Sequence, residues 1–237
     1  MEGFFKHKYE TFPFEIFSFS HTFMILLLFI GILFIFLGRS FLKKHNRIVR
    51  ISFFTILFLL EFLYHIWLYS GGVWDISFAL PLQLCSISLI LCLIMLLTKS
   101  QVVFQIVYFM GISGALMAIL TPELFLGYPH FRFFQFFITH ILIIWTCIYY
   151  VIVHQYIPTT KGLVSSFFFL NGCAAIAYFF NKITRGNYMF LSYKPINGSL
   201  LDYFGPYPYY ILSLEAASLI LFILLLLPFK LKKKRYI

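Results

Sequence analysis

The sequence predicts an all-α protein, a polytopic membrane bundle of seven transmembrane helices with the N-terminus outside and the C-terminus in the cytoplasm. Of its 237 residues, 62% are hydrophobic and only 11% are charged, whereas soluble domains carry about 25% charged residues. Seven apolar runs each approach the ~20 residues that cross a ~30 Å hydrocarbon core. Basic residues also gather in alternate connections, as the positive-inside rule describes for membrane proteins.

The expected spans follow one another with short connections, which predicts a single integral membrane domain over residues 1–237. In chain order the spans cover residues 20–38, 51–70, 80–98, 101–120, 133–154, 163–181 and 207–228. Pro81 suits the first turn of the third span, and Pro206 and Pro208 mark the start of the seventh. Small residues on the fourth span, such as Gly111 and Gly114, predict close helix packing.

The distribution of Lys and Arg sets the expected orientation. One side of the predicted bundle holds 12 of the 18 basic residues. They are Arg39, Lys43, Lys44, Arg47, Arg50, Lys99, Lys161, Lys230, Lys232, Lys233, Lys234 and Arg235. This side is therefore expected to be cytoplasmic, in a multi-pass protein of the cell membrane. The net charge of +10 is then explained by anchoring to anionic lipid, and it does not indicate a nucleic-acid partner.

Ionisable side chains inside the apolar runs are expected to converge on one layer. Glu61, His65, Cys85, His140 and Glu215 all fall in the outer half of the bundle when the predicted topology is drawn. Removing such groups from water costs several kcal/mol unless they are paired, so polar residues within a membrane span mark a functional site by default. The sequence therefore predicts one polar site in the outer leaflet.

A membrane Cys–His pair is the sharpest chemical interpretation of this layer. Cys85 would be a nucleophile that forms a thioester, with His140 as the general base and His65 as the second choice. Cys85 lies five residues into its expected span, where the field of the helix N-terminus is weak, so the base would provide most of the activation. Glu61 or Glu215 could orient an imidazole, as the third member of a triad does.

Other polar residues could donate hydrogen bonds to the developing oxyanion. These candidates are Gln83, Ser86 and Arg132. Three interpretations without catalysis stay open. Glu61 and His65 could be a structural pair, Arg132 could reach the headgroups, and Cys85 could be an apolar filler, as we expect for Cys92, Cys147 and Cys173.

A metal site is the weaker interpretation of the same residues. Glu61, His65, Cys85 and His140 have side chains that bind zinc, but Glu61 and His65 form only an ExxxH pattern and no HExxH motif occurs. We therefore expect neither a metal nor a cofactor.

The order of motifs along the chain supports the enzymatic interpretation. The segments are EFLYHIW, LPLQLCSISLILCL, GALMAILTPE, YPHFRFFQFFITH, NYMFLSYKP and LDYFGPYPYY. Together, over about residues 17–229, they resemble the YwaF-type integral membrane proteins of Gram-positive bacteria. That family is distantly similar to eukaryotic multi-pass phospholipid acyltransferases with a catalytic Cys and His. The resemblance places the Cys at Cys85 and the His at His140.

The leading hypothesis is a membrane acyltransferase or transacylase that moves a fatty acyl chain from a phospholipid through a Cys85 thioester, with His140 as general base. Its expected partners are phospholipid and lysophospholipid substrates. The alternative is a seven-helix transporter or sensory receptor that binds a small ligand in an outward-facing polar cavity. A third possibility is a lipid-binding assembly protein, for which no single polar substitution would have a sharp effect.

Overall fold

Helices account for most of the chain that the structure, a computed structural model, describes: residues 3–7, 12–195 and 200–234. The α-helices are α1 (Phe19–Leu37), α2 (Arg39–Lys44), α3 (Asn46–Ser70), α4 (Leu84–Thr98), α5 (Gln101–Leu120), α6 (Phe131–Ile152), α7 (Thr160–Thr184) and α8 (Tyr209–Lys234), with 3₁₀ turns η1 (Tyr188–Phe190) and η2 (Leu200–Phe204). Lys8 and Arg235, two of the basic residues counted above, lie outside the described residues.

Six of the seven expected spans are confirmed as helices that are long and apolar enough to cross a membrane: α1, α3, α5, α6, α7 and α8. The protein is therefore an all-α bundle with six candidate membrane spans among the described residues. The orientation of the termini stays a prediction.

The third expected span differs from the prediction. Helix was expected from residue 80, but α4 begins only at Leu84 and has 15 residues, which corresponds to a length of about 22 Å. The preceding residues are held by tertiary contacts in place of helical hydrogen bonds. The Leu80 N–H donates to the Tyr188 hydroxyl (3.0 Å), and the Gln83 Oε1 accepts from the Met189 N–H (2.9 Å). Backbone groups outside a helix need other partners, and Tyr188 of η1 supplies one for the Leu80 N–H.

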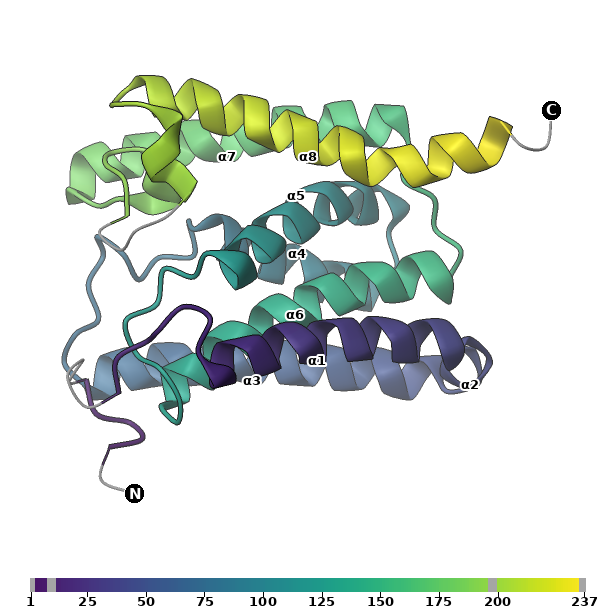
Figure 1. Cartoon of the computed structure of the whole chain (residues 1–237), viewed down its shortest axis with the longest axis horizontal. Coiled ribbons are helices and arrows are strands. Elements are labelled where there is room, and N and C mark those ends of the chain that lie inside the picture. The colour runs from purple at the N-terminus through teal and green to yellow at the C-terminus, as the bar shows by residue number, and fades with distance from the viewer. Residues whose placement is uncertain (1–2, 8–11, 196–199, 235–237) are drawn as a thin grey trace.

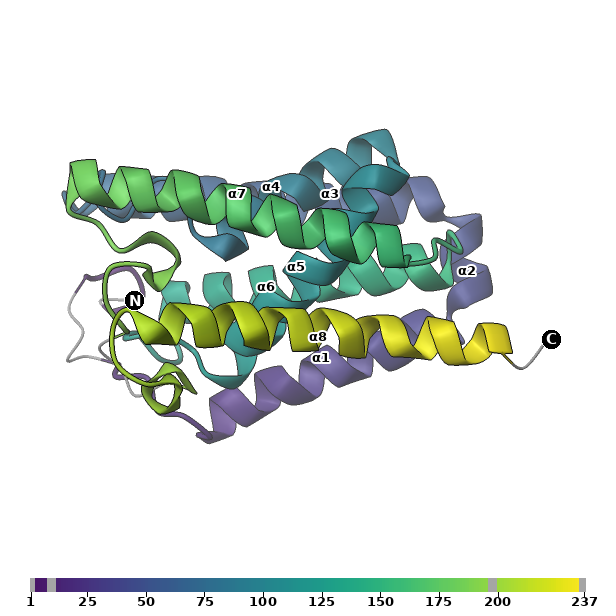
Figure 2. The same ribbon diagram turned by 90° about the horizontal axis from the view of Figure 1, so that it is seen from above.

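Helices α5 and α6 form the centre of the bundle. In α6, 72% of the most apolar window is buried, and in α5 56%, compared with 17–28% in α1, α3, α7 and α8. Helix α5 contacts α4, α6, α7 and α8, and α6 contacts α1 and α3. The long helices run close to one direction, with α7 and α8 on one side of α5 and with α1 and α3 beside α6 (Figures 1 and 2).

The small residues of α5 allow this close packing, as the sequence predicts. A Cβ atom added at Gly111 would lie 3.1 Å from the Ile143 side chain of α6, and one added at Gly114 would lie 2.9 Å from Leu84 of α4. Both distances are shorter than ordinary van der Waals contact. The absence of a side chain therefore lets α4 and α6 approach α5, and this approach sets the position of the α4 start.

The N-terminal segment, residues 3–7 and 12–18, folds back over one end of the bundle, which the sequence did not predict. The Trp67 indole donates to the Phe5 carbonyl (2.8 Å), and the Phe131 N–H donates to the Phe4 carbonyl (2.9 Å). The His130 Nε2 also donates to the Lys6 carbonyl (2.9 Å). These bonds tie the segment to the C-terminal end of α3 and to the start of α6.

Candidate functional site

A small, partly open cavity of about 70 Å³ lies between α3, α4, α6 and the loop that precedes α4. Six of the eight residues predicted to form the site line it, and His65 and Glu215 do not. The lining residues are Glu61, Tyr64, Phe78, Ala79, Leu80, Gln83, Cys85, Ser86, Leu89, Arg132, Gln135, Phe136, Thr139 and His140. The structure thus brings Cys85 and His140, from two different helices, to one small polar cavity.

Cys85 lies closer to a helix start than the sequence indicated. Because α4 begins at Leu84 with Gln83 as its N-cap, Cys85 is the second helical residue and not the sixth of a longer span. No side chain caps this end of α4. The first turn of a helix favours negative charge through its free N–H groups. Cys85 therefore lies within the first turn of α4, closer to the helix N-terminus than the sequence indicated.

His140 is held in one orientation on α6. Its side chain is 4% exposed, and its Nδ1 lies 2.6 Å from the Phe136 carbonyl oxygen. Since a carbonyl only accepts, Nδ1 must carry the proton. Within the described residues no hydrogen bond reaches Nε2, which is the atom left to accept a proton. The group that sets the tautomer of His140 is thus a backbone carbonyl, where the sequence suggested a carboxylate of Glu61 or Glu215.

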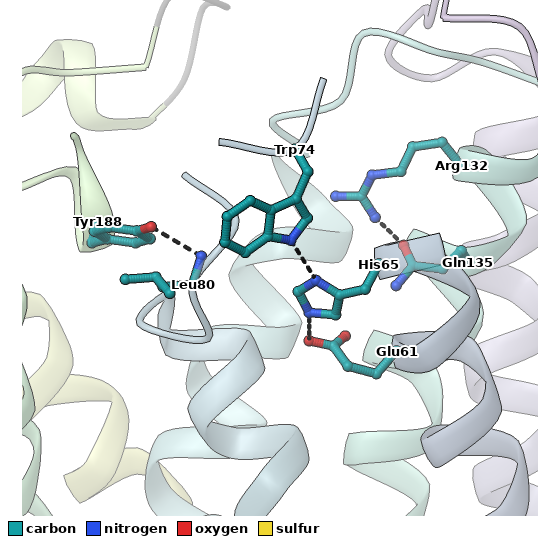
Figure 3. A network of polar contacts seen from close by, with 7 residues as sticks. All are labelled: Glu61, His65, Trp74, Leu80, Arg132, Gln135 and Tyr188. Atoms are coloured by element: carbon teal, nitrogen blue, oxygen red, sulfur yellow. Dashed lines mark hydrogen bonds and ion pairs between the residues drawn. The ribbon is translucent and has the colours of Figure 1, made fainter. Parts of the chain in front are cut away.

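Both nitrogens of His65 are already engaged. Its Nε2 lies 3.7 Å from the Glu61 Oε1, and its Nδ1 accepts from the Trp74 indole N–H (3.3 Å), as Figure 3 shows. An indole can only donate, so the proton of a neutral His65 sits on Nε2, facing the carboxylate. His65 has no free basic nitrogen on either side of its ring. The structure therefore favours His140 over His65 as the general base.

Arg132 stands in the first turn of α6 and faces the cavity. Its guanidinium lies 4.5 Å from the centroid of the Tyr64 ring and 5.4 Å from that of Phe136, and it donates to the Gln135 Oε1. Arg132 also interacts electrostatically with the Glu61 carboxylate. Figure 3 shows the hydrogen bond between Arg132 and Gln135. Tyr64 was missed in the sequence, because an aromatic residue on a membrane helix normally indicates only lipid contact or packing.

Glu215 lies apart from the cavity, contrary to expectation. Its Oε2 accepts from the Asn171 side-chain amide (3.0 Å), which pairs α8 with α7. Depth along the membrane normal was the basis for grouping Glu215 with the other residues. Depth says nothing about the direction in which a helix faces, and α8 packs against α5 and α7. Glu215 is accordingly a partner of Asn171.

Among the described residues, no three His, Cys, Asp or Glu side chains gather closely enough to hold a metal ion.

Tyr188 of η1 positions the start of α4 and was not identified from the sequence. Its side chain is fully buried. Its hydroxyl donates to the Ile76 carbonyl (2.6 Å) and accepts from the Leu80 N–H (3.0 Å), as seen in part in Figure 3. Asn181 holds the Tyr188 backbone through its side-chain amide (2.7 and 3.0 Å). Burial raises the pKa of Tyr188, so the phenol remains a donor at neutral pH.

The loops at this end of the bundle contain two more groups whose pKa is shifted from its ordinary value. Hydrogen bonds from Ser77 lower the pKa of Asp75, which therefore stays ionised in the loop before α4. Burial lowers the pKa of His130. The neutral ring accepts from the Arg132 N–H at Nδ1 (3.0 Å) while Nε2 donates to the Lys6 carbonyl. His130 thus caps α6 and ties down the N-terminal segment at the same time.

Comparison with known proteins places these residues within a family. Residues 16–226 match the TMEM164 family, a stretch that contains the whole cavity. A protein of Treponema pallidum (strain Nichols) described as uncharacterized is 27% identical over 151 residues, which is 64% of this chain. The chain spans 62% of that relative's length. No solved structure matches.

Proposed function

The chain belongs to the TMEM164 family, and from the side chains of its cavity we propose that it is a membrane acyltransferase that moves a fatty acyl chain from one phospholipid to a lysophospholipid. Cys85 carries the acyl group as a thioester, and His140 is the general base. The observation that supports the proposal most strongly is that a thiol in a helix first turn and an imidazole with a free Nε2 line the same small cavity.

The first half of the reaction moves the acyl group onto sulfur. The His140 Nε2 takes the proton of the Cys85 thiol, and the thiolate attacks the carbonyl carbon of the phospholipid ester. A carbon–sulfur bond forms and the carbon–oxygen bond to the glycerol breaks. The leaving glycerol oxygen takes the proton from His140, so a lysophospholipid departs and a neutral imidazole remains.

The second half reverses these steps with another acceptor. A lysophospholipid hydroxyl gives its proton to His140 and attacks the thioester carbonyl. The new ester forms, the sulfur leaves, and His140 returns the proton to Cys85. The thiol and the imidazole end as they began, so no oxidant, reductant or cofactor enters the balance.

Positively charged and hydrogen-bond donating groups around the cavity can stabilise the negative charge that develops in this reaction. The free N–H groups at the start of α4 and the Arg132 guanidinium can stabilise an oxyanion on the attacked carbonyl. The carboxylate of Glu61 balances the charge of Arg132 when the cavity is empty. The proposed location of the reaction is the outer leaflet of the bacterial plasma membrane.

The resemblance to YwaF-type proteins, and more distantly to Cys/His phospholipid acyltransferases, selects the same two residues. The alternative of a transporter or receptor is less well supported. A cavity of about 70 Å³ is much smaller than the roughly 300–1,000 Å³ of typical small-molecule pockets. It has room for a reacting ester group rather than for a whole ligand.

The proposal can be tested by following phospholipid acyl composition with the purified protein in lipid vesicles. The variants Cys85→Ala and His140→Ala should each lower acyl transfer at least about 100-fold, the range expected for a lost base or nucleophile. Cys173→Ala on α7 is the matched control and should retain activity. Turnover near the wild-type level in either of the first two variants would reject the Cys–His dyad.

A further inference from the structure

A second hollow lies on the membrane-facing side of α3, next to the cavity. This open groove has a volume of about 510 Å³ and an almost wholly apolar lining. It is lined by Phe62, His65, Ile66, Tyr69, Ser70 and Trp74. The side chains of Ile66 and Tyr69 are 46% and 81% exposed, so the groove opens towards the surrounding lipid of a membrane-spanning helix.

The groove and the cavity share a thin wall. His65 lines the groove and Glu61 lines the cavity, and their side chains lie 3.7 Å apart. Trp74 closes the same wall from the loop before α4 by donating to the His65 ring (Figure 3). A ligand that occupies both hollows would therefore lie beside the His65 and Trp74 rings.

The cavity and the groove differ in volume, and each fits a different part of one lipid molecule. The cavity, at about 70 Å³, can hold an ester group and a few water molecules. It cannot hold a fatty acyl chain, whereas the groove lies within the size range of ligand pockets and offers an acyl chain apolar contacts. Its floor is a helix of the bundle and its open side faces lipid, from which a chain can enter sideways without crossing water.

We propose that the groove on α3 binds the acyl chain of the donor phospholipid, with the wall of His65 and Trp74 guiding the chain past Glu61 as its ester enters the cavity. The inference rests on the proposed acyl transfer for its choice of ligand. It goes beyond it by naming the surface that holds the chain and therefore selects its length and shape.

The test is photolabelling with a phosphatidylcholine that carries a diazirine in the middle of one acyl chain. The full chain is used in vesicles as the Cys85→Ser variant, so that labelling does not depend on turnover. Labelled peptides should concentrate between residues 62 and 74. Filling the groove with Ile66→Trp should lower this labelling roughly tenfold, a factor that corresponds to about 1.4 kcal/mol of lost binding.

Leu63→Trp is the matched control, because Leu63 is on the same helix and is 43% exposed but does not line the groove. It should label like the parent. Equal labelling of all lipid-facing helices, or equal effects of the two tryptophans, would overturn the proposal, as would cross-linking of the groove to a second protein chain. Labelling of the groove with full transfer activity in Cys85→Ala would instead reject the thioester and leave the chain site standing.

Discussion

The hydroxyl of Tyr188 should control both the stability of the bundle end and the reactivity of Cys85. Tyr188→Phe removes one oxygen atom and keeps the buried ring. It leaves the Leu80 N–H and the Ile76 carbonyl, now bonded at 3.0 and 2.6 Å, without a partner. Each buried group left unpaired costs about 1–3 kcal/mol. We expect the free energy of unfolding to fall by about 2–4 kcal/mol, because water can reach part of the loop.

The functional effect follows from the loop that Tyr188 holds. The segment from Ile76 to Leu80 leads directly into the first turn of α4, so a looser loop should let the Cys85 sulfur leave the cavity. Unfolding in mixed micelles would measure the stability, and the rate of maleimide labelling of Cys85 would measure its exposure. Tyr203→Phe, at a side chain that is 86% exposed, is the control.

This reasoning would be refuted if Tyr188→Phe left the labelling rate of Cys85 unchanged and altered the free energy of unfolding by less than about 0.5 kcal/mol, the usual limit for surface substitutions. Faster labelling with unchanged stability would point to a loop that Tyr188 orders without contributing to the global fold.

Two further predictions concern the two carboxylates Glu61 and Glu215, and the pH dependence that His130 causes. Glu61→Gln should slow acyl transfer about tenfold, because it removes the negative charge that balances Arg132. Glu215→Gln should transfer acyl groups at the wild-type rate. Equal losses of activity in the two variants would contradict the placement of Glu215 beside α7. Because burial lowers the pKa of His130, the unfolded chain binds a proton more readily below about pH 6.5, so stability is full above that pH and is lost on acidification. Hydrogen exchange at the Phe131 amide should accelerate, beyond its intrinsic rate change, between about pH 7 and 5, and His130→Asn, which keeps a capping oxygen, should remove this dependence.

Hydropathy alone predicted the long helices well, because a membrane helix must be apolar over its whole length and satisfies its own backbone. The start of α4 shows where this reasoning ends. Residues 80–83 belong to the same predicted apolar run as the helix that follows, yet the Leu80 N–H and the Gln83 side chain bond to Tyr188 and Met189, which are more than 100 residues away in the chain. A window of local hydropathy contains no information about such partners.

The sequence grouped the candidate site residues by their expected depth, and this grouping matches the geometry only in part. Cys85, His140 and Glu61 do line one cavity, since residues at one depth on neighbouring helices have a fair chance of meeting. Glu215 lies at a comparable depth on a helix that faces elsewhere, and the partners of His65 left it no free nitrogen. The direction of each helix is set by packing, here by the small residues of α5, which the sequence shows only as a tendency.

The central claim is that the Cys85 sulfur carries the acyl group, and the mass of the Cys85 peptide tests it most directly. The protein would be mixed with phospholipid, quenched in acid within one turnover and digested for mass spectrometry. The account predicts a Cys85 peptide that is heavier by one fatty acyl group. Neutral hydroxylamine should remove this group, and the Cys85→Ser variant should form no thioester. An unmodified Cys85 peptide in a preparation that is transferring acyl chains would contradict it.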